Sequence, residues 1–431
     1  FLAVAMIASI IAGCTAVAPA AAPAAAPAAG GEAAAPAAGE TVNLKFQQWW
    51  EPELPKGEFR ALIDECEAQN PGIKVELLSG PYPETKTQLV AGAAAGTMPD
   101  IVGLDGAWVN DFVKQGALAS LTDLMKQANY DDSELAAQIA LNGNTYMIPV
   151  VNFVYPLFVN LDLLEKAGIT TPPSTRTEFA DAAKKLTDSA NNVYGWVLPL
   201  DLEVANGAKN DVMAWVWASG GSMMKDGKPN LVGNEDVKSV MEWIKGMYDD
   251  GSIAPGAFTT KEQDKVTQFS NNRVGMMVDT LAHINMLHTN APDLKFAVAA
   301  LPAKDDYTGK RGMPYASWGI GVAANSQHQA EAWKIVSCLM SKDTNSKLSS
   351  MANAFPGNVN SEPNFVKTDK LFADAFEIYK AGYVADEFTG PPAATDLMRE
   401  FDEQFQLYLD GGQTVDEALQ KTQDAWMKHY Q

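Results

Sequence analysis

The chain has 431 residues, of which 53 are acidic and 32 are basic, so its formal net charge at pH 7 is −21. This charge argues against binding to nucleic acid and against electrostatic adhesion to anionic lipid, because both need clustered Lys and Arg. With 47% hydrophobic and 20% charged residues, the composition is globular. The roughly 390 residues that follow the first 40 suffice for two domains with their own cores.

The first 40 residues predict an export signal and a tether. The apolar run from Phe1 to Ile11 has the length of a signal-peptide core and is too short to cross a bilayer, which takes about 20 residues. We expect residues 1–13 to be part of a signal peptide whose charged start precedes Phe1. Residues 14–40 are mainly Ala, Pro and Gly, and their recurring prolines oppose a continuous helix, so they predict a disordered linker.

The four residues Ile11-Ala12-Gly13-Cys14 resemble the lipobox of bacterial lipoproteins. This resemblance implies that Cys14 becomes the first mature residue and carries a lipid. The protein would then be anchored to the cell membrane by that lipid alone, in the periplasm or on the cell surface. The alternative is an ordinary signal peptide that contains a cysteine.

Strand and helix patterns alternate after residue 41. Apolar and polar residues alternate over 42–46 and 73–77, which predicts two half-buried strands. A helix at 58–69 separates them, and a second helix at about 84–95 leads into a short apolar strand at 101–102. This β-α-β-α-β order predicts a parallel sheet and an α/β fold.

Two later helices have their own start signals. Thr175 with Glu178, and Thr414 with Glu417, each have the spacing of a capping box. The alternation of elements therefore continues to the end of the chain.

The two cysteines after Cys14 are Cys66 and Cys338. Cys66 shares one face of the first predicted helix with Phe59 and Ile63, which predicts a buried thiol. An exported protein can also form disulfides, so a bridge between Cys66 and Cys338 is the alternative.

Sequence signatures of catalysis are absent. The sequence has no GxSxG, HExxH, CxxC or GxxxxGK motif. The four histidines, at positions 283, 288, 328 and 429, are interpreted as surface or helix-end residues. The glycines of 319–324 imitate a dinucleotide fingerprint but lie inside a strand pattern. We expect neither enzymatic activity, nor a cofactor, nor a metal site.

Aromatic residues stand out instead. Several of the ten tryptophans fall at predicted strand or loop ends, and carboxylates lie near them in sequence. The tryptophans are Trp49, Trp50, Trp108 and Trp318, and the carboxylates are Glu51, Asp105 and Asp111. Sugars stack their C–H faces on such rings and bond their hydroxyls to carboxylates. Each tryptophan taken singly can also be a core residue.

Ordered motifs from about residue 42 to 428 resemble extracellular solute-binding proteins of the maltose-binding, family 1 type. They are Glu67-Ala68-Gln69-Asn70-Pro71-Gly72-Ile73, Ala95-Gly96-Thr97-Met98-Pro99-Asp100-Ile101, Val159-Asn160-Leu161-Asp162-Leu163-Leu164-Glu165-Lys166-Ala167-Gly168, Ala330-Glu331-Ala332-Trp333 and Gly412-Gln413-Thr414-Val415-Asp416-Glu417-Ala418-Leu419. The chain departs from the family at Val159, where a Tyr is usual, and at Pro156, where a small residue is usual.

The resemblance implies a two-lobed periplasmic-binding-protein fold, type II-like, with a mainly parallel sheet in each lobe and the ligand between the lobes. We expect lobe 1 to comprise residues 41–152 and 299–344, and lobe 2 residues 153–298 and 345–431. The expected crossings lie near 151–155, 297–300 and 341–346. The resemblance also implies a monomer that delivers a carbohydrate to an ABC permease.

The ligand-contact residues predicted from these patterns come from both lobes. They are Trp49, Trp50, Asp105, Tyr155, Asp211, Asp279 and Trp318. The segment after Asp100 keeps the family's chemistry but not its positions, so the expected sugar is not a maltodextrin. A polyol, glycerol phosphate or peptide ligand, a secreted glycosidase, and an adhesion or scaffold role are the alternatives.

Overall fold

The computed structural model describes residues 41–430. The predicted signal peptide, Cys14 and the linker to residue 40 lie outside these residues. Within the described part, no helix is long and apolar enough to cross a membrane.

The first sheet contains the predicted strands 42–46, 73–77 and 101–102. Its strands are, in spatial order, β14 (Phe355–Pro356), β5 (Asn144–Val154), β13 (Tyr315–Val322), β3 (Ile101–Leu104), β1 (Val42–Gln48) and β2 (Ile73–Ser79), with β4 (Ile139–Leu141) paired to β5. β1 pairs in parallel with β2 and β3, as the sequence predicts. β13 and β5 run antiparallel to their neighbours, so the sheet is mixed rather than mainly parallel.

The second sheet is smaller and also mixed. Its order is β11 (Phe296–Ala299), β6 (Leu157–Asn160), β10 (Val274–Val278) and β7 (Tyr194–Trp196). β10 is parallel to β7, but β6 is antiparallel to both of its neighbours. The prediction of mainly parallel sheets is therefore wrong for both sheets. β6 and β13 each enter their sheet directly from a crossing between the two cores, and they run opposite to the strands that are connected through helices.

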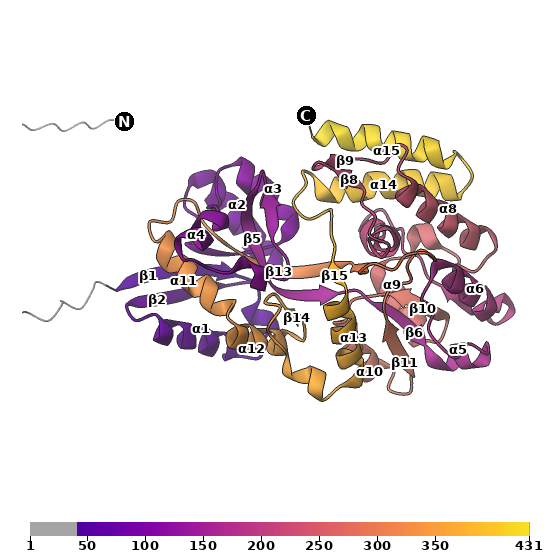
Figure 1. Ribbon diagram of the computed structural model, residues 1–431, viewed down its shortest axis with the longest axis horizontal. Helices are drawn as coiled ribbons and strands as arrows, with labels where there is room; N and C mark the ends of the chain where they lie inside the picture. Colours follow the sequence, from indigo (N-terminus) through magenta and orange to yellow (C-terminus); the bar gives the residue numbers. More distant parts are fainter. Residues whose placement is uncertain (1–40, 431) are drawn as a thin grey trace, which may run out of the picture. The chain divides into compact units, whose positions relative to one another are not determined.

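Helices cover both sheets (Figure 1). Those near the first sheet are α1 (Glu58–Gln69), α2 (Tyr82–Ala95), α3 (Gly106–Lys114), α4 (Leu121–Gln127), α11 (Gln329–Leu339) and α12 (Lys342–Ala352). Those near the second are α5 (Leu161–Lys166), α6 (Arg176–Leu186), α7 (Ala214–Trp217), α8 (Glu235–Asp249), α9 (Glu262–Ser270), α10 (His283–Asn290), α13 (Lys370–Ala381), α14 (Ala394–Leu409) and α15 (Val415–His429). Both predicted capping boxes are present, at the start of α6 and of α15.

Short elements complete the fold. The small strand pairs are β8 (Met224–Lys225) with β9 (Lys228–Pro229), and β12 (Gly312–Met313) with β15 (Tyr383–Val384). A π-helix spans Ala208–Met213 directly before α7. π-Helical turns are rare and often mark functional positions.

The buried apolar side chains form two separate cores, one around each sheet. Core membership changes along the chain between Val151 and Val154, between Tyr315 and Trp318, and between Ala354 and Phe355. The last two changes come later than the crossings expected near 297–300 and 341–346. Residues 296–299 form β11 of the second sheet, and α12 packs with α1 and α11 near the first.

A disulfide joins Cys66 in α1 to Cys338 in α11, with the two Cα atoms 5.8 Å apart. Cys66 is therefore buried as expected but not a free thiol, and the alternative interpretation is correct. Helical periodicity could place Cys66 on the inner face of α1, but it could not show which side chain of another helix meets it.

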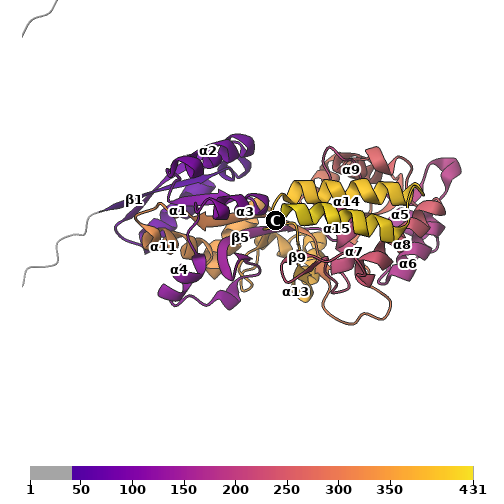
Figure 2. The ribbon, with the colours of Figure 1, turned by 90° about the horizontal axis from the view of Figure 1, so that it is seen from above.

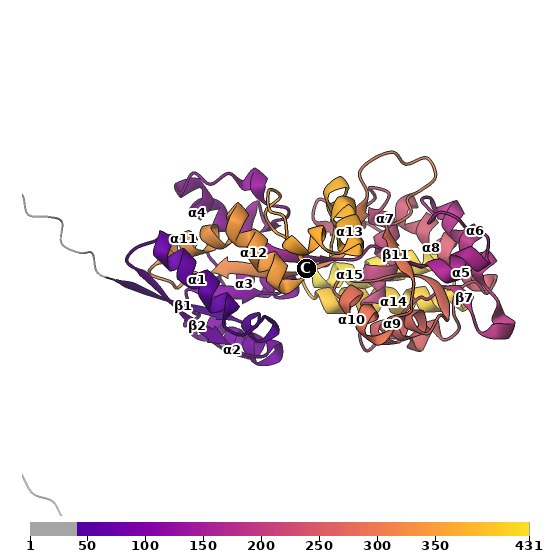
Figure 3. The same cartoon turned by 90° about the horizontal axis from the view of Figure 1, so that it is seen from below.

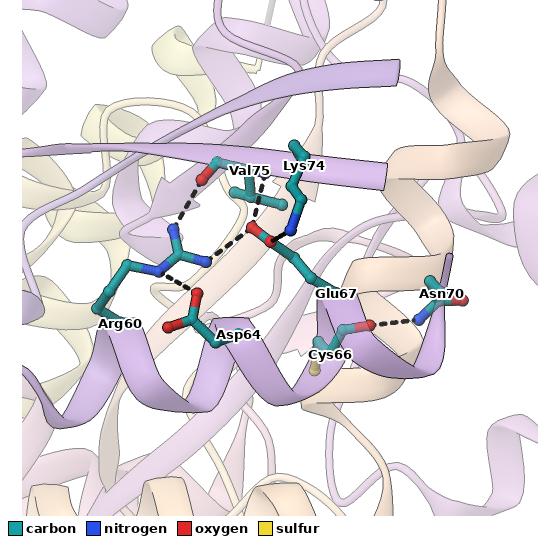
Figure 4. Close-up of polar contacts among 7 residues, drawn as sticks. All are labelled: Arg60, Asp64, Cys66, Glu67, Asn70, Lys74 and Val75. Atoms are coloured by element: carbon teal, nitrogen blue, oxygen red, sulfur yellow. Dashed lines mark hydrogen bonds and ion pairs between the residues drawn. The ribbon is translucent and has the colours of Figure 1, made fainter. Parts of the chain in front are cut away.

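A buried carboxylate fastens α1 to β2 (Figure 4). Glu67 accepts hydrogen bonds from Arg60 Nη2 at 2.8 Å, Lys74 Nζ at 2.7 Å and the Val75 amide at 2.9 Å. Arg60 also donates to the Val75 carbonyl and to Asp64. Burial alone would raise the pKa of Glu67, but these hydrogen bonds and the charges of Lys74 and Arg60 outweigh it and lower the pKa.

Candidate ligand-binding site

Three parallel strands of the first sheet end at one edge, where ligands of open α/β sheets bind. Trp49 follows β1, Tyr82 follows β2 after a short loop, and Asp105 follows β3. Because β1 lies between β2 and β3, the residues after these strands are brought together. Two of the three, Trp49 and Asp105, were predicted from sequence.

Aromatic rings pack closely at this edge. The Trp49 ring lies 5.2 Å from that of Tyr82 and 5.4 Å from that of Trp108, and Tyr82 lies 5.0 Å from Trp108. The Tyr82 hydroxyl donates to Asp105 Oδ2 at 3.1 Å, while Asp105 Oδ1 caps α3 through the Ala107 amide. Burial and the charge of Asp105 raise the pKa of Tyr82, which keeps its hydroxyl a donor.

Trp50 and Trp318 have a different environment. Their rings stack at 5.7 Å with an interplanar angle of 8°, and they are 0% and 7% exposed. Trp50 also packs edge-on against Phe46 and Phe59 of the first core. The Trp50 Nε1 atom is buried and has no hydrogen-bond partner in the described chain. Trp50 is thus a core residue beneath the edge, and Trp318 is covered to about the same degree as Trp49 and Trp108, which are 4% and 5% exposed and belong to the same core.

A groove of about 470 Å³ is lined by one of these rings, that of Trp108. Lys86, Trp108 and Asp111 line it from the first core, and residues 393–396 line it from the start of α14. The Lys86 ammonium lies 5.7 Å from the centre of the Trp108 ring. Trp108 and Asp111 were noted as candidates in the sequence, but Tyr82, Lys86 and the start of α14 were not.

A second groove, of about 560 Å³, is lined by Asn110, Lys114, Glu387 and His429. Residues 389–392, which lead into α14, also line this second groove, and residues 393–396 line the first. Asn110 Nδ2 donates to the Gly390 carbonyl at 2.8 Å. A Cβ atom on Gly106 would lie 2.4 Å from Thr389 Cγ2. The amino-terminal half of α3 and residues 389–390 are therefore in close contact, and Gly106 permits it.

A cluster of charged side chains lies at the carboxyl end of β10 in the second sheet. Lys265 of α9, which is 0% exposed, reaches Asp211 Oδ2 at 3.2 Å and Glu262 Oε2 at 2.6 Å. Asn210 Nδ2 also donates to Glu262 at 2.9 Å. Asp279, directly after β10, contacts His283 Nδ1 at 2.8 Å. The π-helix supplies Asn210 and Asp211 to this cluster.

Burial and charge act in opposite directions on Lys265. Burial alone would lower its pKa, but the charges of Asp211, Glu262 and Asp279 outweigh burial and raise it. Lys265 is therefore a permanent cation. Burial raises the pKa of Asp211 well above its usual range, and Lys265 offsets only part of this. One oxygen each of Asp211 and Asp279 has no hydrogen-bond partner within residues 41–430.

Tyr155 lies at the first crossing, where its amide donates to the Pro314 carbonyl at 3.0 Å. Burial, followed by the charges of Glu262 and Asp279, raises the pKa of its hydroxyl. Tyr155 therefore lies beside the charged cluster, and it belongs with Asp211 and Asp279. The predicted residues form two groups: these three near the second sheet, and the tryptophans with Asp105 near the first.

Sequence reasoning missed Lys265, Glu262 and His283. The sequence did contain one signal for Lys265. It is adjacent to Val266 and lies four residues before Phe269, both of which are buried, so this lysine falls on the apolar face of its helix. His283 follows Asp279 by one helical turn. The described residues contain no group of three or more His, Cys, Asp or Glu side chains suited to a metal ion.

Residues 52–346 match the family described as bacterial extracellular solute-binding protein. A protein of Brucella abortus (strain 2308), named only as a binding protein, is 30% identical over 306 residues, or 70% of this chain and 72% of its own length. The fold is similar to that of the cyclic alpha-maltosyl-1,6-maltose binding protein of Arthrobacter globiformis, with a TM-score of 0.75, 17% identity and coverage of 89% of this chain and 98% of that chain. The sugar-binding protein MalE of Xanthomonas citri has a TM-score of 0.74 and 16% identity, with coverage of 90% and 97%.

The match extends over more than half of the sequence and the two-lobed α/β fold agrees with it. The chain belongs to the family of bacterial extracellular solute-binding proteins.

Proposed function

We propose that this protein is the sugar-binding subunit of an ABC importer, held at the outer side of the cell membrane by a lipid on Cys14. It binds a monosaccharide or an oligosaccharide, closes around it, and delivers it to the permease without chemical turnover. Lobe 1 comprises the first sheet and its helices, and lobe 2 the second. The protein acts as a monomer.

The observation that carries the proposal is the aromatic platform of Trp49, Tyr82 and Trp108 beside Asp105, in which Tyr82 is 37% exposed and Trp108 lines a groove of about 470 Å³. Rings offer apolar faces to sugar C–H groups, and carboxylates accept bonds from hydroxyls. Since the other wall of the groove is the start of α14, a sugar placed there would contact both cores. Contacts to both sides would favour a closed state over an open one.

The names of similar structures agree with this chemistry. The Arthrobacter globiformis protein is named for binding cyclic alpha-maltosyl-1,6-maltose, and the Xanthomonas citri protein is named as sugar-binding. A phosphate-bearing ligand fits the site less well, because it would want clustered arginines. The groove is lined by Lys86 and Lys114 but also by Asp111 and Asp396. In the charged cluster, Lys265 is already paired with two carboxylates.

A thermal-shift screen of residues 41–431 tests the proposal. The panel contains mono- and oligosaccharides, polyols, peptides and phosphates, because a ligand that binds only the folded state raises Tm with its concentration. We expect a rise confined to one class of sugar. A flat response to all sugars together with a response to peptides or phosphates would overturn the proposal, and so would hydrolysis of a glycoside.

The anchor is tested separately. In cells, Cys14→Ala should release the protein from the membrane fraction, because no other lipid attachment is expected. Unchanged retention of this variant in membranes would refute the lipid anchor and leave the sugar function untouched.

A further inference from the structure

His283 is the partly exposed member of the charged cluster near the second sheet. Its side chain is 27% exposed, whereas that of Asp279 is 1% exposed. Asp279 bonds to Nδ1, which leaves Nε2 as the atom without a hydrogen-bond partner among residues 41–430. A histidine whose Nδ1 donates to a carboxylate has a fixed ring orientation and presents Nε2 outward.

His283 lies next to the first crossing between the two cores. The amides of Asp279 and Leu281 donate to Pro156 and Val154 at the first crossing, so the start of α10 adjoins the crossing segment. Figure 3 shows α10, α9 and α2 toward the same edge of the molecule, and Figure 2 shows α2 and α9 at that edge from the opposite direction. In Figure 1, α10 lies below the crossing strands and α2 above them.

The charges around His283 do not balance. Asp279 faces it from the turn after β10, the charges of Glu262 and Lys265 on α9 also act on it, and Asp211 of the π-helix is paired with Lys265. Asp279 and Glu262 thus oppose one ammonium, because burial raises the pKa of Asp211 and favours its neutral form, and Tyr155 adds a hydroxyl but no charge. A ligand that covers the exposed parts of Glu262 and His283, which are 25% and 27% exposed, removes water beside a net negative charge, which is costly unless a positive charge is supplied.

We propose that His283, oriented by Asp279, contacts the bound sugar through Nε2 and takes up a proton as the ligand binds, so that affinity is higher in mildly acidic than in alkaline medium. This rests on the proposed sugar-binding function. In the protonated ring Nε2–H donates to a sugar oxygen, and such charge-assisted bonds are the stronger kind. The proton also offsets the excess negative charge of the covered cluster.

The sign of the effect follows from the free protein. Burial alone would lower the pKa of His283, but the hydrogen bond and charge of Asp279 outweigh it and raise the pKa. Ligand binding raises it further, so affinity is greatest below the free-protein pKa and falls as the pH rises toward the higher pKa of the complex. One linked proton changes affinity by at most about tenfold per pH unit.

The test repeats the sugar panel with residues 41–431 at about pH 5.5 and about pH 8, on either side of an ordinary histidine pKa. The sugar with the largest shift is then titrated calorimetrically in two buffers of different ionisation enthalpy. We expect Kd to be at least about threefold lower at the acidic pH, with net proton uptake at pH values between the pKa of the free protein and that of the complex. His283→Gln should weaken binding and abolish both the pH dependence and the uptake.

Two further variants separate this role from a structural one. Asp279→Asn keeps an acceptor for Nδ1 but removes the charge, so it should move the pH dependence to lower pH. His288→Gln changes another histidine of α10, which lies beside Asp369. The sugar affinity of this variant should depend on pH in the same way as that of wild type. Equal sugar affinity at both pH values, or a pH dependence that survives in His283→Gln, would overturn the inference while the sugar function stands. No response to any sugar at either pH would overturn both.

Discussion

The aromatic residues near the end of β1 differ in how much of each side chain is exposed. Tyr82 is 37% exposed and touches both Trp49 and Trp108, whereas Trp50 is fully buried. Trp50 instead packs against Phe46 and Phe59, so Trp49 and Trp50 have different neighbours.

Tyr82→Ala should therefore weaken sugar binding by about three- to tenfold, the range of one aromatic contact. Its Tm should fall less than that of a variant that removes a fully buried ring, because Tyr82 is 37% exposed. Tyr383→Ala is a matched control, since Tyr383 is 38% exposed but lies outside the aromatic platform. Calorimetric titration of both variants checks this, and equal losses of affinity would contradict the assignment of Tyr82.

Glu67 makes a contribution to stability that depends on pH. Because its pKa is lowered in the folded protein, the contribution is present above the ordinary carboxyl pKa of 4.5 and is lost as the pH falls through the folded pKa. Glu67→Gln should lower the free energy of unfolding by about 1–3 kcal/mol at neutral pH. The difference from wild type should shrink below about pH 4.

Denaturant titrations at neutral and acidic pH measure this difference. Glu65→Gln is the control on the same helix, because Glu65 and its partner Lys347 are 47% and 54% exposed. Such exposed pairs contribute about 0–1 kcal/mol. A loss in Glu67→Gln that is the same at both pH values would contradict the interpretation.

At the scale of elements, the contact of α3 with the segment before α14 joins the two cores. Gly106→Ala places a methyl group where Thr389 lies, so it should hold the cores apart and reduce ligand-induced compaction in small-angle scattering. We expect affinity for the sugar to fall by about tenfold or more, as when closure is impaired. Gly246→Ala in α8 is the control, because its methyl group would meet nothing within 4 Å.

Thr389→Ser removes the Cγ2 atom that the new methyl group would strike. Combined with Gly106→Ala, it should restore part of the affinity. Full affinity in Gly106→Ala alone would show that the contact does not govern closure.

Elements that depend on neighbouring residues could be predicted from the sequence, whereas pairings between distant segments could not. The strand near 73–77, the helix at 58–69 and the capping boxes at Thr175 and Thr414 are confirmed, because periodicity and caps are properties of neighbouring residues. The antiparallel position of β13 could not be predicted, since its partners β3 and β5 are far away in sequence. Lys265 is similar: a lysine can be fully buried only when carboxylates from other segments meet it.

The whole molecule depends on the bond between Cys66 and Cys338. The double variant Cys66→Ser with Cys338→Ser should lose about 2–4 kcal/mol of stability and unfold several degrees lower in calorimetry. Cys66 is 0% and Cys338 7% exposed, so reductant should act on wild type only as it unfolds and should leave the variant unchanged. Equal Tm values for the two proteins would contradict a stabilising bond.

The same disulfide also determines what happens to the protein when a protease cuts its chain. Cys66 and Cys338 are separated by 272 positions, and the part of the chain that builds most of the second core lies between them. A protease that cuts a loop in that stretch, such as 302–310, leaves two polypeptides that remain covalently joined through the first core. The pieces cannot diffuse apart, so a nicked receptor keeps both halves of its first sheet in one particle.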